Sequence, residues 1–142
     1  MKTAKKTAVL AMFTGLSLIM FLIESLFPPL VLPGAKMGLA NIFSFAALIM
    51  YSPLEAFLVV IVRTGLGAIF SGNVSVLLFS FSGGMVSMAV SSLLMYTAYP
   101  KISVMAVSIT AAVAHNVTQN AVFALMSGSL LMFGYMPYLI LL

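Results

Sequence analysis

One imidazole and three carboxamide side chains fall within six residues of a largely apolar stretch: His115, Asn116, Gln119 and Asn120. At about 100° per residue they lie on one wedge of a helix, with Gln119 about 40° from His115. Ser108 falls on the same side, about 20° from His115. Imidazole and carboxamide groups can hydrogen-bond a ligand or join neighbouring helices, the latter at about 0.6 kcal/mol each. Four such groups so close together favour the ligand site over interhelical packing alone.

Arg63 lies midway along a second apolar stretch. A charged side chain at the centre of a bilayer costs about 2.5–3.5 kcal/mol on insertion scales. We therefore predict that Arg63 is buried against the helix of His115 or against the helix at 36–51, and that it does not face lipid. Together with Lys36, which precedes that helix, Arg63 favours an anionic ligand.

The composition is that of a membrane protein. Hydrophobic residues make up 63% of the 142 residues, against six basic and two acidic ones. The chain has no Cys, and its one His lacks Asp or Cys partners, so we expect no metal site and no cofactor. The basic residues are scattered between apolar stretches, which gives no reason to expect a nucleic-acid partner.

The apolar stretches predict an all-α membrane protein, a bundle of five to six transmembrane helices in one domain covering residues 1–142. Turns rich in Pro and Gly separate the stretches. The expected spans are at about 7–27, 36–51, 54–71, 74–98 and 102–126, with a partial sixth at 136–142.

Lysines predict the orientation in the membrane. Lys2, Lys5 and Lys6 place the amino terminus in the cytoplasm of a multi-pass protein of the plasma membrane. The first apolar run is too long for the core of a signal peptide, so we expect it to be retained as a span. Alternation of the spans then places the polar groups of the fifth helix in the outer half of the bilayer.

Small residues form a stripe on the first span: Ala4, Ala8, Ala11 and Gly15 lie within about 60° of one another on a helix. Such a stripe lets another helix approach closely. The other helix can belong to the same chain or to a separate membrane subunit, and the stripe alone does not distinguish the two.

Four motifs in order resemble one known family. Residues 33–41 read PGAKMGLAN, residues 63–67 read RTGLG, and residues 79–84 read FSFSGG, with Ser87 after them. His115-Asn116 with Gln119 completes the series. Over about residues 24–137 the chain resembles the membrane family of heptaprenyl diphosphate synthase component I, also called the Gx transporter family. Members of that family continue well beyond a Tyr-x-Pro block, whereas this chain stops five residues after Pro137.

That family resembles the substrate-binding S components of energy-coupling factor transporters, which are six-helix membrane proteins. The resemblance implies a small-molecule importer subunit that docks on a transmembrane coupling subunit with ATPases. It implies docking through Ala4, Ala8, Ala11 and Gly15, and a ligand site formed by Lys36, Asn41, Arg63, His115, Asn116 and Gln119. The expected ligand is an anionic isoprenoid- or quinone-related precursor, or a vitamin.

The chemistry of prenyl chain elongation excludes this chain as the catalytic subunit. Such enzymes need aspartate clusters that hold Mg²⁺ against a diphosphate. This chain has no Asp, and its two carboxylates, Glu24 and Glu55, lie on different spans. It also lacks a phosphate-binding loop for ATP. We therefore expect no enzyme activity. Two alternatives to the importer subunit remain, a non-catalytic membrane subunit of a polyprenyl diphosphate synthase and a scaffold of a membrane redox complex.

Overall fold

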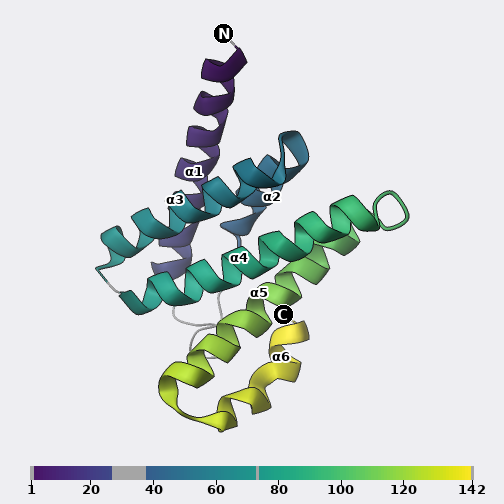
Figure 1. The fold of residues 1–142 in the computed structure, drawn as a ribbon. Coiled ribbons are helices and arrows are strands. Elements are labelled where there is room, and N and C mark those ends of the chain that lie inside the picture. Colours follow the sequence, from purple (N-terminus) through teal and green to yellow (C-terminus); the bar gives the residue numbers. More distant parts are fainter. Residues whose placement is uncertain (1, 27–37, 73, 142) are drawn as a thin grey trace.

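The computed structural model describes residues 2–26, 38–72 and 74–141, and every regular element within them is helical (Figure 1). The elements are α1 (Lys2–Leu26), α2 (Asn41–Met50), α3 (Pro53–Ser71), α4 (Val74–Thr97), α5 (Val104–Ser127), the 3-10 helix η1 (Leu130–Tyr135) and α6 (Met136–Leu141). Three helical segments are long and apolar enough to cross a membrane: Thr3–Leu26, Pro53–Ser71 and Leu77–Thr97. The predicted fold class, an all-α membrane protein, is confirmed.

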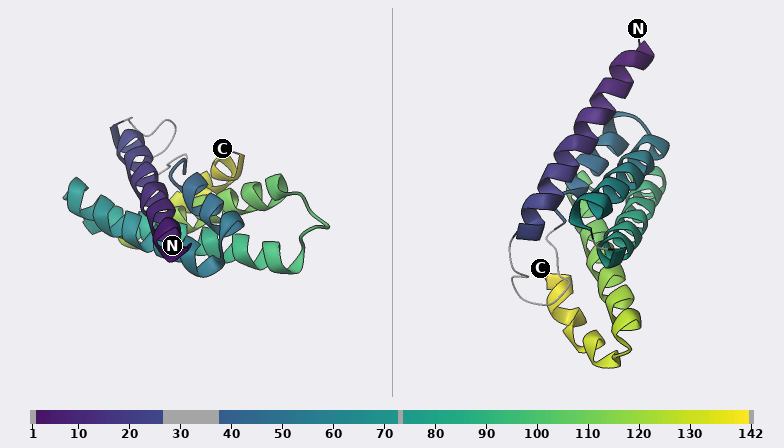
Figure 2. Two further views of the ribbon diagram at one scale, coloured as in Figure 1. Left: turned by 90° about the horizontal axis from the view of Figure 1, so that it is seen from above. Right: turned by 90° about the vertical axis from the view of Figure 1, so that its left-hand side faces the viewer.

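Helices α3, α4 and α5 run in alternating directions, each packed on the next, and α1 and α2 cover α3 (Figures 1 and 2). The amino-terminal end of α1 projects beyond the other helices in Figure 1 and in the right-hand view of Figure 2. Helix α6 returns along α5 after η1. One end of the bundle therefore carries the start of α1, the connection from α2 to α3 and the connection from α4 to α5, which contains Lys101.

The core lies where α1, α2, α3 and α4 meet. Its buried members are Phe13, Ala47, Leu48, Ala56, Val59, Val60 and Met88. Small residues on α2 and α3 let these helices pack closely, while large apolar side chains such as Ile19, Leu93 and Ile109 stay exposed on the outside. Exposed apolar side chains on this scale suit a surface that faces lipid rather than water.

Helix α2 starts later than the sequence predicted. The expected span at 36–51 becomes a helix over Asn41–Met50, preceded by a turn at residues 38–40, and Lys36 lies outside the described residues. Gly38 has φ +74°, a left-handed conformation that a helix cannot contain, and its carbonyl accepts from the N–H of Asn41 at 2.8 Å. Ten residues rise about 15 Å, half of the ~30 Å hydrocarbon core.

The turn at 38–40 packs against α1. Ser17 of α1 is completely buried, and its Oγ donates to the carbonyl of Ala40 at 2.6 Å. Non-helical backbone at membrane depth is tolerated where it is buried in protein or lines a cavity. The turn meets this requirement, because Ala40 is buried and Gly38 and Leu39 line a cavity.

Candidate functional site

Asn41 joins three helices in the middle of the bundle. Nη2 of Arg63 donates to Oδ1 of Asn41 at 3.0 Å, and Nδ2 of Asn41 lies 3.1 Å from Nδ1 of His115. Arg63 is the eleventh of the 19 residues of α3, and His115 is the twelfth of the 24 residues of α5. The side chain of Arg63 is 2% exposed. The prediction that Arg63 is buried against the second or fifth span is confirmed.

The arginine determines the direction of both hydrogen bonds. A guanidinium can only donate, so the Asn41 atom that faces it must be the carbonyl oxygen. The amide nitrogen then faces His115, and because it can only donate, Nδ1 of the histidine must accept. His115 is therefore neutral in this arrangement, with its proton on Nε2.

The positive charge of Arg63 has an acidic counterpart across the turn at 38–40. Oε1 of Glu24 accepts from the backbone N–H of Leu39 at 2.6 Å, and its carboxylate interacts electrostatically with Arg63. Nε of Arg63 has no hydrogen-bond partner among the described residues. The charge is thus offset inside the protein by a group from α1, which lowers the cost of burying it.

Two adjacent glycines let α4 approach these polar groups. A Cβ built on Gly83 would lie 2.8 Å from Cε1 and Nδ1 of His115. A Cβ on Gly84 would lie 2.8 Å from Cγ1 of Val60 and 3.2 Å from Nη2 of Arg63. Real Cβ atoms essentially never come within 3.0 Å of such neighbours. The FSFSGG motif therefore supplies the space in which the histidine ring and the guanidinium lie.

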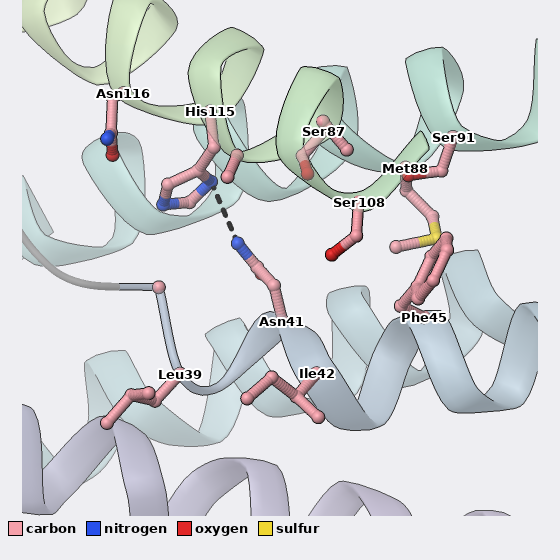
Figure 3. A pocket seen from close by; sticks show the side chains of 13 residues that line it. Leu39, Asn41, Ile42, Phe45, Ser87, Met88, Ser91, Ser108, His115 and Asn116 are labelled. Carbon is pink, nitrogen blue, oxygen red and sulfur yellow. Dashed lines mark hydrogen bonds between the residues drawn. The ribbon is translucent and has the colours of Figure 1, made fainter. Parts of the chain in front are cut away.

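A cavity of about 180 Å³ lies beside Asn41 and His115, between α2, α4 and α5 (Figure 3). Its polar lining includes three serines, Ser87 and Ser91 on α4 and Ser108 on α5, with Asn116 near one end. Its apolar lining comes from Leu39, Ile42, Phe45, Met88, Ala111 and Ala112. The described residues that line the cavity include no Lys, Arg, Asp or Glu.

The cavity extends from the middle of the bundle toward the end that carries Lys101. Ser91 lies six residues before the end of α4, and Ser108 is the fifth residue of α5. The sequence instead predicted that the polar groups of the fifth helix converge toward the other end of the bundle, where Gln119 and Asn120 lie. Nδ2 of Asn120 donates to the carbonyl of Met132 in η1, so it has a packing role.

The structure brings together part of the predicted ligand set. Asn41, His115 and Asn116 line the cavity. Arg63 does not line it and reaches it only through Asn41. Gln119 is 4% exposed, lies beside Gly83, and its Oε1 has no hydrogen-bond partner in the described part of the chain. Lys36 lies outside the described residues.

The small-residue stripe on α1 lies on the surface. Ala4, Ala8 and Ala11 are exposed, and Gly15 is half-buried. A Cβ on Gly15 would have no neighbour within 4 Å. The stripe is therefore not used to pack α1 against the other described helices.

Ser91 and the apolar residues of the cavity are not among the residues that the sequence predicted to bind a ligand. A signal was available, because Ser87 and Ser91 are four residues apart and so share one face of α4. Serines are common in membrane helices, where their hydroxyls usually bond the carbonyl four residues earlier, as Ser92 does with Met88 at 2.7 Å. Ser91 differs only in its surroundings, which the sequence does not reveal.

Comparison with known proteins identifies a family. A family model described as heptaprenyl diphosphate synthase component I matches residues 13–142. That description names one component of a synthase and therefore a protein that works with others. Neither the curated proteins nor the solved structures contain a match. Because the match covers nearly the whole chain, the protein belongs to the heptaprenyl diphosphate synthase component I family.

Proposed function

We propose that this chain is the substrate-binding membrane subunit of a small-molecule importer, similar to an S component. The observation that carries the proposal is the cavity between α2, α4 and α5, in which Asn41, His115 and Asn116 meet an apolar wall. A mostly apolar pocket with a few convergent polar groups is the usual form of a small-molecule site.

The position of Asn41 also supports a binding role. Its amide is held between Arg63 and His115, so it is ordered before any ligand arrives. Order of this kind reduces the entropy lost on binding. The backbone of the adjacent turn at 38–40 lies at the same depth, which suits a cavity wall better than a lipid-facing surface.

The partner in this proposal is a transmembrane coupling subunit served by ATPases. The exposed stripe of Ala4, Ala8 and Ala11 supports it, because small side chains on an accessible helix face allow close contact with another membrane helix. The chain itself contains no phosphate-binding loop, so energy from ATP would have to come from that partner.

The test is mass spectrometry of small molecules retained by the protein after purification from its own membranes. A matched pair of variants defines the site: Ala112→Phe places a ring at the cavity wall, whereas Ile109→Phe changes an exposed position on the same helix outside the cavity. We expect one compound retained by the wild type and by Ile109→Phe and lost from Ala112→Phe. Retention of nothing, or equal retention by all three, contradicts the proposal.

A second candidate function follows from the family description, namely a non-catalytic membrane subunit of a polyprenyl diphosphate synthase. The two candidates differ in partner. Affinity purification of the tagged chain from native membranes should recover an ATPase pair if the importer proposal is right. Recovery of a soluble prenyl synthase instead would favour the second candidate.

A further inference from the structure

We infer that the cavity binds the uncharged, hydrogen-bonding head of an amphiphile that comes from the membrane itself, with its apolar tail leaving between α2 and α5. This inference rests on the proposed binding function and specifies its ligand class. It follows from the charge, hydrogen bonding and exposure of the residues that line the cavity.

The charge of the lining determines the charge of the head. Among the described lining residues none is acidic or basic, and His115 is neutral because its Nδ1 accepts from Asn41. Arg63 lies behind Asn41, with its Nη2 already engaged and Glu24 opposing its charge. An anion buried here would find no cationic side chain among the described lining residues, which is costly in a medium of low dielectric. The sequence-based expectation of an anionic ligand therefore does not extend to this cavity.

The hydroxyls of the lining determine what the head must offer. Ser87 and Ser91 are 3% and 0% exposed, one turn apart on α4, and line the cavity together with Ser108 of α5 (Figure 3). Oγ of Ser91 has no hydrogen-bond partner among the described residues. A buried hydroxyl without a partner is unfavourable, and each serine can both donate and accept. Hydroxyl or carbonyl groups on a ligand would satisfy them.

The volume limits the size of the head. The cavity measures about 180 Å³. Pockets that enclose a whole drug-sized molecule measure roughly 300–1,000 Å³. The cavity therefore suits a compact polar group with a few methylenes, and the remainder of a longer ligand must lie outside it.

The exposure of the lining shows where that remainder goes. Ile42 on α2 is 59% exposed, and Ser108 and Ala112 on α5 are exposed as well, so the cavity opens sideways between these two helices. Ile49, seven residues after Ile42 and so on the same face of α2, is also apolar and exposed. An opening on the side of a membrane bundle, between its middle and one end, faces hydrocarbon. An apolar tail continues there without meeting water.

The test uses two lipids that share a tail and a glycerol and differ only in a phosphate: 1-oleoylglycerol and 1-oleoylglycerol 3-phosphate. The protein in phosphatidylcholine nanodiscs is labelled with a photo-crosslinking 1-oleoylglycerol that carries a diazirine in its acyl chain. Each unlabelled lipid then competes, at a stated mole fraction of the bilayer. We expect 1-oleoylglycerol to halve the labelling at a mole fraction at least tenfold lower than 1-oleoylglycerol 3-phosphate needs. The labelled peptides should come from α2 or α5.

Two matched pairs of variants locate the head and the opening. Ser91→Ala should reduce competed labelling at least fivefold, whereas Ser92→Ala, whose hydroxyl bonds its own helix, should stay within twofold of wild type. Ala112→Phe should block labelling and Ile109→Phe should not. An unchanged elution volume in size-exclusion chromatography and an unchanged melting temperature establish that each variant folds. If Ser91→Ala does not fold, Ser87→Ala is used in its place.

Three results would overturn the inference: equal or better competition by the phosphate, equal losses for Ser91→Ala and Ser92→Ala, or no competed labelling. None of them decides the proposed function, which depends on the compound retained from native membranes. A retained anion displaced by Ala112→Phe would support the binding function and refute the uncharged head.

Discussion

Nδ2 of Asn41 lies 3.1 Å from Nδ1 of His115, and this contact fixes the tautomer of the only histidine in the chain. The tautomer follows from a second hydrogen bond, in which Arg63 donates to Oδ1 of the same amide and so turns Nδ2 toward His115. Because the two contacts share one side chain, a change at any of the three residues alters the hydrogen bonding of the other two.

The first prediction concerns this tautomer. ¹⁵N NMR of protein labelled on histidine should show Nδ1 without a proton and as a hydrogen-bond acceptor, and Nε2 protonated. In Asn41→Leu the Nδ1 signal should move toward that of a free acceptor, since the donor is gone. A proton on Nδ1 in the wild type would mean that the amide is turned the other way and that Arg63 is not its partner.

A second prediction concerns the coupling of Arg63 to Asn41. Arg63→Met removes the donor to Oδ1 of Asn41, and Asn41→Leu removes that acceptor from the buried guanidinium, each at a cost of about 1–3 kcal/mol in the free energy of unfolding. The double variant should lose less than the sum of the single losses, by about 0.5–3 kcal/mol. Unfolding in mixed micelles measures the cycle, and strict additivity would show that the two side chains do not interact.

A third prediction tests the close approach of α4. Gly83→Ala places a Cβ 2.8 Å from the ring of His115 and should lower the free energy of unfolding by about 1–3 kcal/mol. Gly65→Ala on α3 is the control, because its Cβ would meet nothing within 4 Å and alanine favours a helix. Thermal unfolding of both variants decides the point, and equal melting temperatures would place His115 elsewhere.

A fourth prediction concerns the ion pair between Lys6 and Glu55, which joins the start of α1 to the start of α3. Nζ of Lys6 also lies 5.6 Å from the ring centroid of Tyr51. Lys6→Gln should lower the melting temperature slightly at low salt, and the difference should shrink at about 1 M salt, where charges are screened within roughly 3 Å. Lys5→Gln, an exposed change nearby, is the control.

A fifth prediction concerns docking. Ala8→Leu or Ala11→Leu should leave the protein folded, because both positions are exposed, but should abolish co-purification with a transmembrane coupling subunit. Met12→Leu, at a large and exposed apolar position on the same helix, should have no effect. Wild-type recovery of the partner with all three variants would remove the stripe from the proposed interface.

The burial of Arg63 was predictable from the sequence, because it follows from the free-energy cost of placing a charge in lipid. That cost favours burial against a polar partner, and in the structure Arg63 donates a hydrogen bond to Asn41. The sequence did not predict where α2 begins, because the left-handed Gly38 is one glycine among ten and its conformation depends on tertiary contacts. Nor did it distinguish Ser91 from Ser92, since only the position of α2 and α5 around α4 makes one face a cavity and the other bond its own helix.

The short helix α2 has a polar anchor at its first residue and another two residues after its end. At its start Asn41 is bound to Arg63, and after its end Ser52 hydrogen-bonds Glu55, which pairs with Lys6. Its ten residues therefore act as a spacer of fixed length between the middle of the bundle and the end that carries Lys101. Inserting or deleting a single residue within α2 would break one anchor or the other, whereas most single substitutions on its exposed face leave that length intact.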